Sequence, residues 1–323
     1  PRDPASIGDQ VGIDSSSDGV YEYVITATDV AGRTKQLTRT VRFDATSPDS
    51  NTITTPAADV TAPAYISGAA YTFKGTASDA AGGVKLAKIY YRFSQSTVKS
   101  TVLGDYTALT AQDGIEWSVS KDIISGTDSE AALTAEKLCE GTWYLHVLAE
   151  DKAGNRTEFV DAETRRFDID LTNPEADETV INTASTVDRT GLFNMTVTAE
   201  DTNALKNVTI VQKRNGTGDV TICNIDYTTE KDETITLIGL PHTNSSNTSV
   251  AIDGSADGLY TYDITLTDFA DKKHTITRSV RFDTQAPVIS NVVYPPSAYL
   301  NLPSNYTYRV TGTASDEALG SAL

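Results

Sequence analysis

The sequence predicts an all-β protein built of β-sandwich modules in tandem, and two observations support this prediction. The first is a segment that occurs three times, at residues 18–48, 140–174 and 257–287, so that its period is about 115 to 125 residues, the length of a folded domain. The second is a strict alternation of apolar and polar residues within each copy, which is typical of half-buried β-strands. Many short strands joined by polar turns favour a sandwich.

Each copy of the segment predicts a β-hairpin. In the first copy Tyr21, Tyr23 and Ile25 share one face of a strand, and a short polar turn leads into a second, Thr-rich strand. This second strand ends in Phe-Asp in all three copies, with the aspartates at Asp44, Asp168 and Asp283. Another strand, upstream of the hairpin in each module, also ends in an aspartate, at Asp79, Asp201 and Asp316.

The phase of the repeat divides the chain of 323 residues into four parts. Residues 1–48 are expected to be the C-terminal part of one module, and residues 287–323 the N-terminal part of another. Residues 49–173 and 174–286 are expected to be complete modules. The chain is therefore expected to be a length cut from a longer protein at both ends.

Composition excludes several classes of partner. The formal net charge is -18 and the estimated pI is about 4.5, which argues against binding to nucleic acid and against adsorption to anionic membranes. No stretch approaches the length and apolarity of a membrane-spanning helix. The two cysteines, Cys139 and Cys223, lie in different modules and are expected to be small buried hydrophobic residues rather than a disulfide or a zinc site.

The sequence predicts no enzyme. The three histidines are scattered without a metal-ligand spacing, and His146 alternates onto the outward face of its strand. There is no GxSxG motif, and acidic pairs that recur once per module are better explained as structure than as an active site. Trp117 and Trp143 are expected in the core. If one module has a private binding surface, the insert at residues 94–114, the least repeated part of its module, is the place where it is expected.

Three motifs together resemble a known family. GTASD at residues 75–79, D-x-A-G-N at residues 151–155 and the FD-x-x-x-P ending of the first and third hairpins are similar to the bacterial immunoglobulin-like, or cadherin-like, tandem repeats of large surface proteins and adhesins. The resemblance implies seven-strand Greek-key immunoglobulin-like sandwiches arranged head to tail, an extracellular location at the cell surface, and spacer or adhesive work without catalysis. Only residues 151–155 carry the full DKAGN form, and residues 268–272 lack its glycine.

In an immunoglobulin-like fold the B–C and F–G loops lie at the same end, where the chain enters, and the last strand leaves at the other end. In a head-to-tail string, the aspartate that closes one module is therefore expected to meet the loop aspartates of the next. The expected groups are Asp44 with Asp79 and Asp151, Asp168 and Asp170 with Glu200, Asp201 and Asp268, and Asp283 with Asp316.

Carboxylates that converge in this way repel one another unless a cation lies among them. Calcium is the expected ion, because it takes about six to eight oxygen ligands with flexible geometry. The alternative is purely structural, because aspartate at the start of a turn caps the local backbone, and Asp29, Asp151 and Asp268 each begin a hairpin turn. The sequence leaves both interpretations open.

The function expected from these features is that of an extracellular structural region, a stalk or spacer of a large prokaryotic surface protein or adhesin, stiffened by calcium at its module junctions. Its partners would be neighbouring modules of the same chain, with sister chains or a surface ligand as further candidates. Two alternatives stay open. One is a self-assembling subunit of a surface layer or filament sheath, and the other is a carbohydrate-binding accessory module.

Overall fold

The structure is a computed structural model that divides into two compact units, Pro1–Leu171 and Thr172–Leu323, and each is described by itself. It describes residues 15–58, 63–79, 84–110, 116–177, 187–188, 193–201, 205–214, 217–228, 232–240, 250–293, 304–305 and 309–316.

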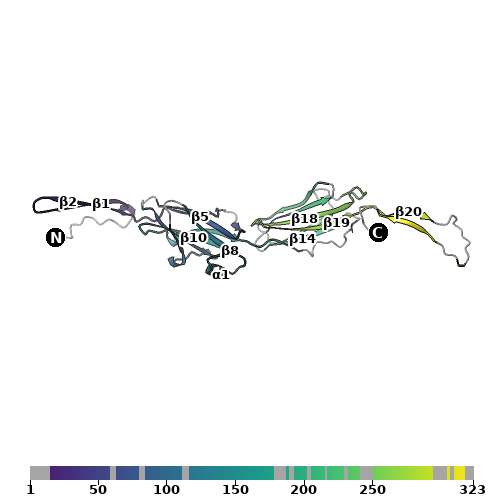
Figure 1. Cartoon of the computed structure of the whole chain (residues 1–323), viewed down its shortest axis with the longest axis horizontal. Coiled ribbons are helices and arrows are strands. Elements are labelled where there is room, and N and C mark those ends of the chain that lie inside the picture. Colours follow the sequence, from purple (N-terminus) through teal and green to yellow (C-terminus); the bar gives the residue numbers. More distant parts are fainter. Residues whose placement is uncertain are drawn as a thin grey trace. The chain divides into compact units, whose positions relative to one another are not determined.

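The first unit begins with the predicted hairpin, which follows a short 3-10 turn, η2 (Ser15–Ser17). Strand β1 (Gly19–Thr28) forms an antiparallel hairpin with β2 (Thr34–Phe43) (Figure 1). The two strands pair along their whole lengths, and Gly19 lies opposite Phe43. Most of the hairpin's apolar side chains are exposed, including Tyr23 and Ile25. The turn between the strands is capped by Asp29, whose Oδ1 accepts the backbone N–H groups of Ala31 and Arg33, both at 2.9 Å.

A β-sandwich follows the hairpin. One sheet has the strand order β3-β5-β8-β9 and the other has the order β4-β11-β10-β6-β7, and neighbouring strands are antiparallel except for the β4–β11 and β8–β9 pairs. The chain crosses from one sheet to the other between β3, β4, β5 and β6 and again after β7 and β9, as in an immunoglobulin-like Greek key. The strands are β3 (Ser50–Thr55), β4 (Ala64–Ile66), β5 (Ala70–Ser78), β6 (Leu86–Ser94), β7 (Thr107–Thr110), β8 (Glu116–Ile124), β9 (Leu138–Cys139), β10 (Gly141–Asp151) and β11 (Glu163–Ile169).

The described connections of this sandwich contain three short helices. They are η3 (Leu103–Asp105), α1 (Ser129–Thr134) and η4 (Phe159–Asp161). Asp128 caps α1, because its Oδ1 accepts the backbone N–H of Ala131 at 3.0 Å. No helix in the described ranges is long and apolar enough to cross a membrane.

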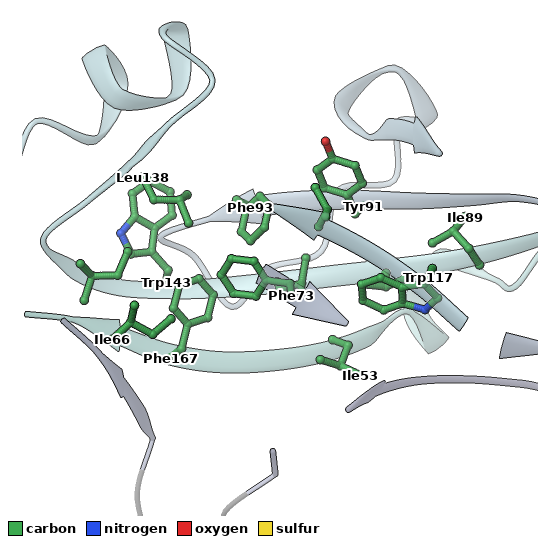
Figure 2. Packing of buried hydrophobic residues seen from close by; sticks show 14 of the residues in the cluster. Ile53, Ile66, Phe73, Ile89, Tyr91, Phe93, Trp117, Leu138, Trp143 and Phe167 are labelled. Atoms are coloured by element: carbon green, nitrogen blue, oxygen red, sulfur yellow. The ribbon is translucent and has the colours of Figure 1, made fainter. Parts of the chain in front are cut away.

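The core of this sandwich lies between the two sheets and is aromatic (Figure 2). The ring of Phe73 packs against Phe93 and Phe167, with centroids 4.8 and 4.9 Å apart. Trp143 is fully buried and donates its indole N–H to the Cys139 carbonyl at 2.8 Å. Trp117 is buried as well, so the prediction that both tryptophans belong to the core is confirmed.

Gly75 is required by its partner across the sheet. It lies opposite Trp117 in the β5–β8 pair, and a Cβ atom at Gly75 would lie 2.2 Å from the Trp117 ring and 2.3 Å from the Thr52 carbonyl oxygen. A side chain there would overlap atoms that have no room to move. The glycine of the GTASD motif therefore makes space for an indole ring.

The insert covers the outer face of β6 and β10. Tyr90, Tyr106, Leu148 and Ala162 form a small second cluster on this face, and the Tyr90 hydroxyl donates to Glu150 at 3.1 Å. His146 lies on the same outward face, as alternation predicts, but it is fully buried. Its Nδ1 lies 2.9 Å from Thr164 Oγ1 and its Nε2 lies 3.2 Å from the Ser96 carbonyl oxygen.

The burial of His146 predicts a pH-dependent stability. Burial lowers the pKa of this imidazole; the Ser96 carbonyl opposes the shift, and the cationic Arg92 and Lys99 add to it. The folded protein therefore takes up a proton on His146 only at a lower pH than the unfolded chain, which takes it up below about pH 6.5. The stability that the neutral ring contributes is present above that pH and is lost as the pH falls towards the folded pKa, by about 1.4 kcal/mol for each unit of pKa depression.

The free energy of unfolding is measured at about pH 7.5 and at about pH 5.5, because these two values bracket the ordinary histidine pKa. The quantity compared between variants is the loss of free energy between the two pH values. We expect a smaller loss in His146→Gln than in the unchanged protein. His274→Gln is the control, because His274 is only half-buried. Equal losses in the two variants would contradict the prediction.

The second unit repeats the sandwich. Its sheets have the orders β12-β14-β17 and β13-β19-β18-β15-β16, with only β13 and β19 parallel among the described pairs. A separate antiparallel pair, β20 with β21, follows. The strands are β12 (Glu175–Asp177), β13 (Val187–Asp188), β14 (Phe193–Glu200), β15 (Leu205–Arg214), β16 (Val220–Asp226), β17 (Asp232–Leu240), β18 (Gly258–Asp268), β19 (Lys273–Phe282), β20 (Val288–Val293) and β21 (Thr311–Ser315).

The core of the second unit uses a different pair where the first has Gly75 and Trp117. In the β14–β17 pair Val197 lies opposite Ile235, and both are buried. The first unit pairs a residue without a side chain with a large indole ring, and the second unit pairs two side chains of intermediate size. The core volume that each pair fills is therefore similar. Apart from β9, which has no counterpart among the described strands of the second unit, the two sandwiches share a strand order, but they pack their interiors differently.

Candidate metal centres

Strand register identifies which aspartates are equivalent in the three hairpins. The glycine that begins the first strand lies opposite Phe43 in the first hairpin, Ile169 in the second and Phe282 in the third. The residue that follows is an aspartate each time, so the equivalent residues are Asp44, Asp170 and Asp283.

Aligning the Phe-Asp motifs selects Asp168 instead of Asp170, and the register shows why these differ. Phe167 lies opposite Trp143, two positions before the end of the pairing at Gly141 and Ile169. Asp168 therefore lies within β11, where it is buried and accepts hydrogen bonds from Arg166 Nη2, the shorter at 3.0 Å. Asp170 follows the strand and is fully buried.

The first unit brings three of the predicted residues together. Asp44 follows β2, Asp79 follows β5 and Asp151 ends β10, and each offers a carboxylate oxygen within 4.8 Å of the others. Asp151 is 1% exposed and Asp44 is 7% exposed. Asp79 is half-buried as a residue, but both of its carboxylate oxygens are out of contact with solvent.

Asp151 caps its turn as the structural alternative predicts. Its Oδ1 accepts the backbone N–H groups of Gly154 at 2.7 Å and Asn155 at 2.9 Å, and its Oδ2 accepts Asn155 Nδ2 at 2.8 Å. The Asn155 amide also donates to the backbone carbonyl of Asp44 at 3.0 Å, which ties the end of the β1–β2 hairpin to the sandwich. Asp151 therefore caps its turn and at the same time lies close to Asp44 and Asp79, so the two interpretations of this residue are compatible.

The other two aspartates have buried oxygens that the described part of the chain leaves without a hydrogen bond. They are Oδ2 of Asp44 and both carboxylate oxygens of Asp79, whereas Oδ1 of Asp44 accepts the N–H of Thr46 at 3.0 Å. Burial raises the pKa of Asp79, and the charges of Asp44, Asp151 and Asp49 raise it further; the Lys85 backbone amide lowers it, although it makes no hydrogen bond of normal geometry to either Asp79 oxygen. The negative potential at this point is strong.

No lysine or arginine relieves this potential within the described ranges, because none forms an ion pair with Asp44, Asp79 or Asp151. Three carboxylates that lie close together favour a cation among them. The donors are hard oxygen atoms from aspartates, which fit calcium better than the nitrogen and sulfur ligands of zinc sites. The residues present therefore fit a calcium ion.

The second unit places two of its predicted residues together in the same way. Asp201 follows β14 and Asp268 ends β18; both are buried, and they offer carboxylate oxygens within 4.8 Å of each other. Asp268 caps its turn through Oδ1, which accepts the N–H of Lys272 at 2.8 Å. Glu200, the residue before Asp201, is exposed.

The last predicted group is represented by Asp283 and Asp316. Asp283 is buried, and its Oδ1 accepts the N–H of Gln285 at 3.0 Å, just as Asp44 accepts that of Thr46. Asp316 follows β21 and is half-buried. Each of these aspartates therefore has the local setting of its counterpart in the first unit.

A cavity of about 390 Å³ lies beside the insert and is lined in part by Tyr91 and Phe93. The Lys121 ammonium lies 5.8 Å from the Tyr91 ring centroid and 6.0 Å from that of Phe93, and it donates to the Glu136 carbonyl at 3.2 Å. A face of each ring is thus covered by a side chain of the protein, unlike the bare aromatic platform that a carbohydrate-binding module needs.

Comparison with known families agrees with the fold. Residues 47–170 match the family model described as "Bacterial Ig-like domain", so this part of the chain belongs to that family. The resemblance seen in the GTASD, DKAGN and FD motifs is thereby confirmed, and the fold is that of tandem immunoglobulin-like sandwiches. A comparison with curated protein sequences found no match.

Solved structures with similar repeats include two from adhesins. One, described as a tetra-tandem repeat in the extending region of a large adhesion protein, is 18% identical with a TM-score of 0.32, and the match covers 86% of this chain and 60% of that one. The other, from a 1.5-MDa bacterial ice-binding adhesin, is 15% identical with a TM-score of 0.30, covering 83% of this chain and 76% of that one. The chain thus spans 60% of the length of the first structure.

Proposed function

We propose that this chain is an extracellular structural region, a stalk or spacer within a large prokaryotic surface protein or adhesin, and that calcium at its module junctions makes it stiff. The bacterial immunoglobulin-like domain at residues 47–170, the tandem sandwiches and the net charge of -18 support this proposal. The partners of each module are then its neighbours in the same chain.

The observation that carries the proposal is the group of Asp44, Asp79 and Asp151. Asp44 closes the hairpin of one module, while Asp79 and Asp151 belong to the loops of the sandwich that follows. An ion held by all three would join the two modules directly. Without the ion, repulsion among the carboxylates opposes the same contact.

The proposal extends to the other junctions through the repeat. Asp170 is the register equivalent of Asp44, and we propose that it acts with Asp201 and Asp268. Asp283 and Asp316 would form part of a third site. Asp168 is left out of the proposed ligands, because Arg166 neutralises it within β11.

Calcium binding of this kind is testable on the whole chain. Both tryptophans lie in the first unit, so tryptophan fluorescence reports the unfolding of that unit alone. We expect millimolar calcium to raise its melting temperature, as the dissociation constants of about 10⁻⁴ to 10⁻³ M for extracellular modules imply. Small-angle X-ray scattering is expected to show a longer and less variable particle with calcium than with chelator.

Two results would count against the proposal. If the double variant Asp44→Ala, Asp151→Ala keeps the calcium-dependent melting of the unchanged protein, these aspartates hold no calcium. If calcium instead drives the chain into large ordered assemblies, a lattice or sheath subunit is the better description. Magnesium at equal concentration is the control for general screening of charge, because it demands stricter octahedral geometry than calcium does.

A further inference from the structure

An acidic residue with no place in the proposed metal group stands at the start of each hairpin. It precedes the first glycine of the strand, as Asp18, Glu140 and Asp257 in the three copies. Its carboxylate accepts a backbone N–H from the far end of the hairpin: Ala45 N to Asp18 Oδ1 at 2.7 Å, Leu171 N to Glu140 Oε1 at 3.1 Å, and Thr284 N to Asp257 Oδ1 at 3.1 Å.

The three contacts reach the same point of the repeat. The donor is each time the residue directly after the register-equivalent aspartate, Asp44, Asp170 or Asp283. In two copies a threonine hydroxyl adds a second bond to the same carboxylate, from Thr46 to Asp18 and from Thr284 to Asp257. The contact therefore holds across copies although the acid itself changes from aspartate to glutamate.

The backbone explains why the acid stands where it does. The glycine that follows it has a positive φ in each copy, most clearly Gly141 at +122°, a conformation that few other residues adopt. The chain changes direction at this glycine, so that the carboxylate of the preceding acid reaches the backbone just after the end of the partner strand. Asp257 is 6% exposed, and Asp18 and Glu140 are half-buried.

We propose that Asp18, Glu140 and Asp257 are positioning residues for the calcium sites. By holding the peptide that follows Asp44, Asp170 or Asp283, each fixes the direction in which that ligand's carboxylate points before an ion arrives. This inference rests on the proposed function, and it assigns these acids no contact with the ion. In Asp18 both carboxylate oxygens are engaged by Ala45 and Thr46.

The test compares variants at Asp18 in the whole chain. Its readout is the calcium dependence of the melting temperature of the first unit, followed by tryptophan fluorescence, which yields an apparent calcium affinity separate from the calcium-free stability. Residues that orient metal ligands typically contribute about 10- to 100-fold to metal affinity. We expect Asp18→Ala to weaken the apparent affinity about tenfold or more.

Asp18→Glu serves as the conservative rescue, because glutamate fills this position in the second copy, and its affinity is expected to stay close to that of the unchanged protein. Asp29→Ala is the matched control, since it removes an exposed turn cap from the same hairpin, outside the metal group. It is expected to leave calcium affinity unchanged.

The outcomes separate this inference from the proposed function. If the unchanged protein shows no calcium dependence, the proposed function fails. If it does and Asp18→Ala binds calcium as tightly while melting lower in its absence, the acid is only a structural cap and the inference is wrong. If Asp18→Glu fails to rescue, the carboxylate contact to Ala45 is not what matters, and the inference is again overturned.

Discussion

Replacing Asp79 by asparagine is expected to remove the calcium stabilisation of the first unit and, at the same time, to stabilise the calcium-free protein. The two effects have opposite signs because Asp79 contributes a charge whose only compensation within the described residues is the Lys85 amide. Relief of repulsion between charges about 4 Å apart is worth about 1 kcal/mol or more. The lost calcium contribution is about 2.7 kcal/mol when calcium is 100-fold above its dissociation constant.

The measurement is the melting temperature of the first unit by tryptophan fluorescence, in chelator and in calcium. Asp29→Asn is the matched control, because Asp29 is exposed and Arg33 bonds both of its carboxylate oxygens; the Arg33 backbone amide and then its side chain keep the pKa of Asp29 low. The control is expected to retain the full calcium shift. A calcium shift that survives in Asp79→Asn would show that the ion lies elsewhere.

Replacing Gly75 by valine is expected to destabilise the first sandwich by about 3 kcal/mol or more, at the upper end for overpacked cores. The first new carbon atom would already lie 2.2 Å from Trp117, and the Thr52 backbone on the other side cannot yield. The measurement is the free energy of unfolding in denaturant. Gly104→Val is the control, because Gly104 is exposed and a Cβ there meets only Val102, at 3.9 Å.

The second unit supplies a rescue for this variant. The double variant Gly75→Val, Trp117→Ile recreates the pair Val197 and Ile235, and it is expected to recover part of the lost stability, with Trp143 left as the fluorescent reporter. Additive losses from the two substitutions would show that their contact is not the source of the destabilisation.

The hairpins, the sandwich and the buried tryptophans could be predicted from the sequence because they depend on local periodicity. The alternation of apolar and polar residues over β10 and β18 is enough to assign Trp143 and Tyr262 to the buried face of their strands, without knowledge of the rest of the chain. The meeting of Asp44, Asp79 and Asp151 was also expected, because strand order alone decides which loops share an end of a sandwich. That these residues bind calcium stays a prediction.

Other features depend on contacts between distant segments and could not be read from local pattern. The equivalence of Asp170 with Asp44 follows from pairing with Gly141, and a motif comparison that starts from Phe167 misses it by two residues. His146 is buried because the insert folds over an outward face that alternation leaves open. The role of Asp18 was missed, although the recurrence of an acid before glycine was a visible signal.

The unequal core pairs of the two sandwiches bear on how such a chain avoids misassembly while it folds. Neighbouring repeats of like topology can exchange strands, a characteristic failure of multidomain chains. Here an exchanged β5 would set Gly75 against Ile235 and leave a void, while an exchanged β14 would force Val197 into Trp117. Either exchanged sandwich is destabilised by poor packing of its core. Divergence in sequence between adjacent repeats therefore favours the correct pairing of strands.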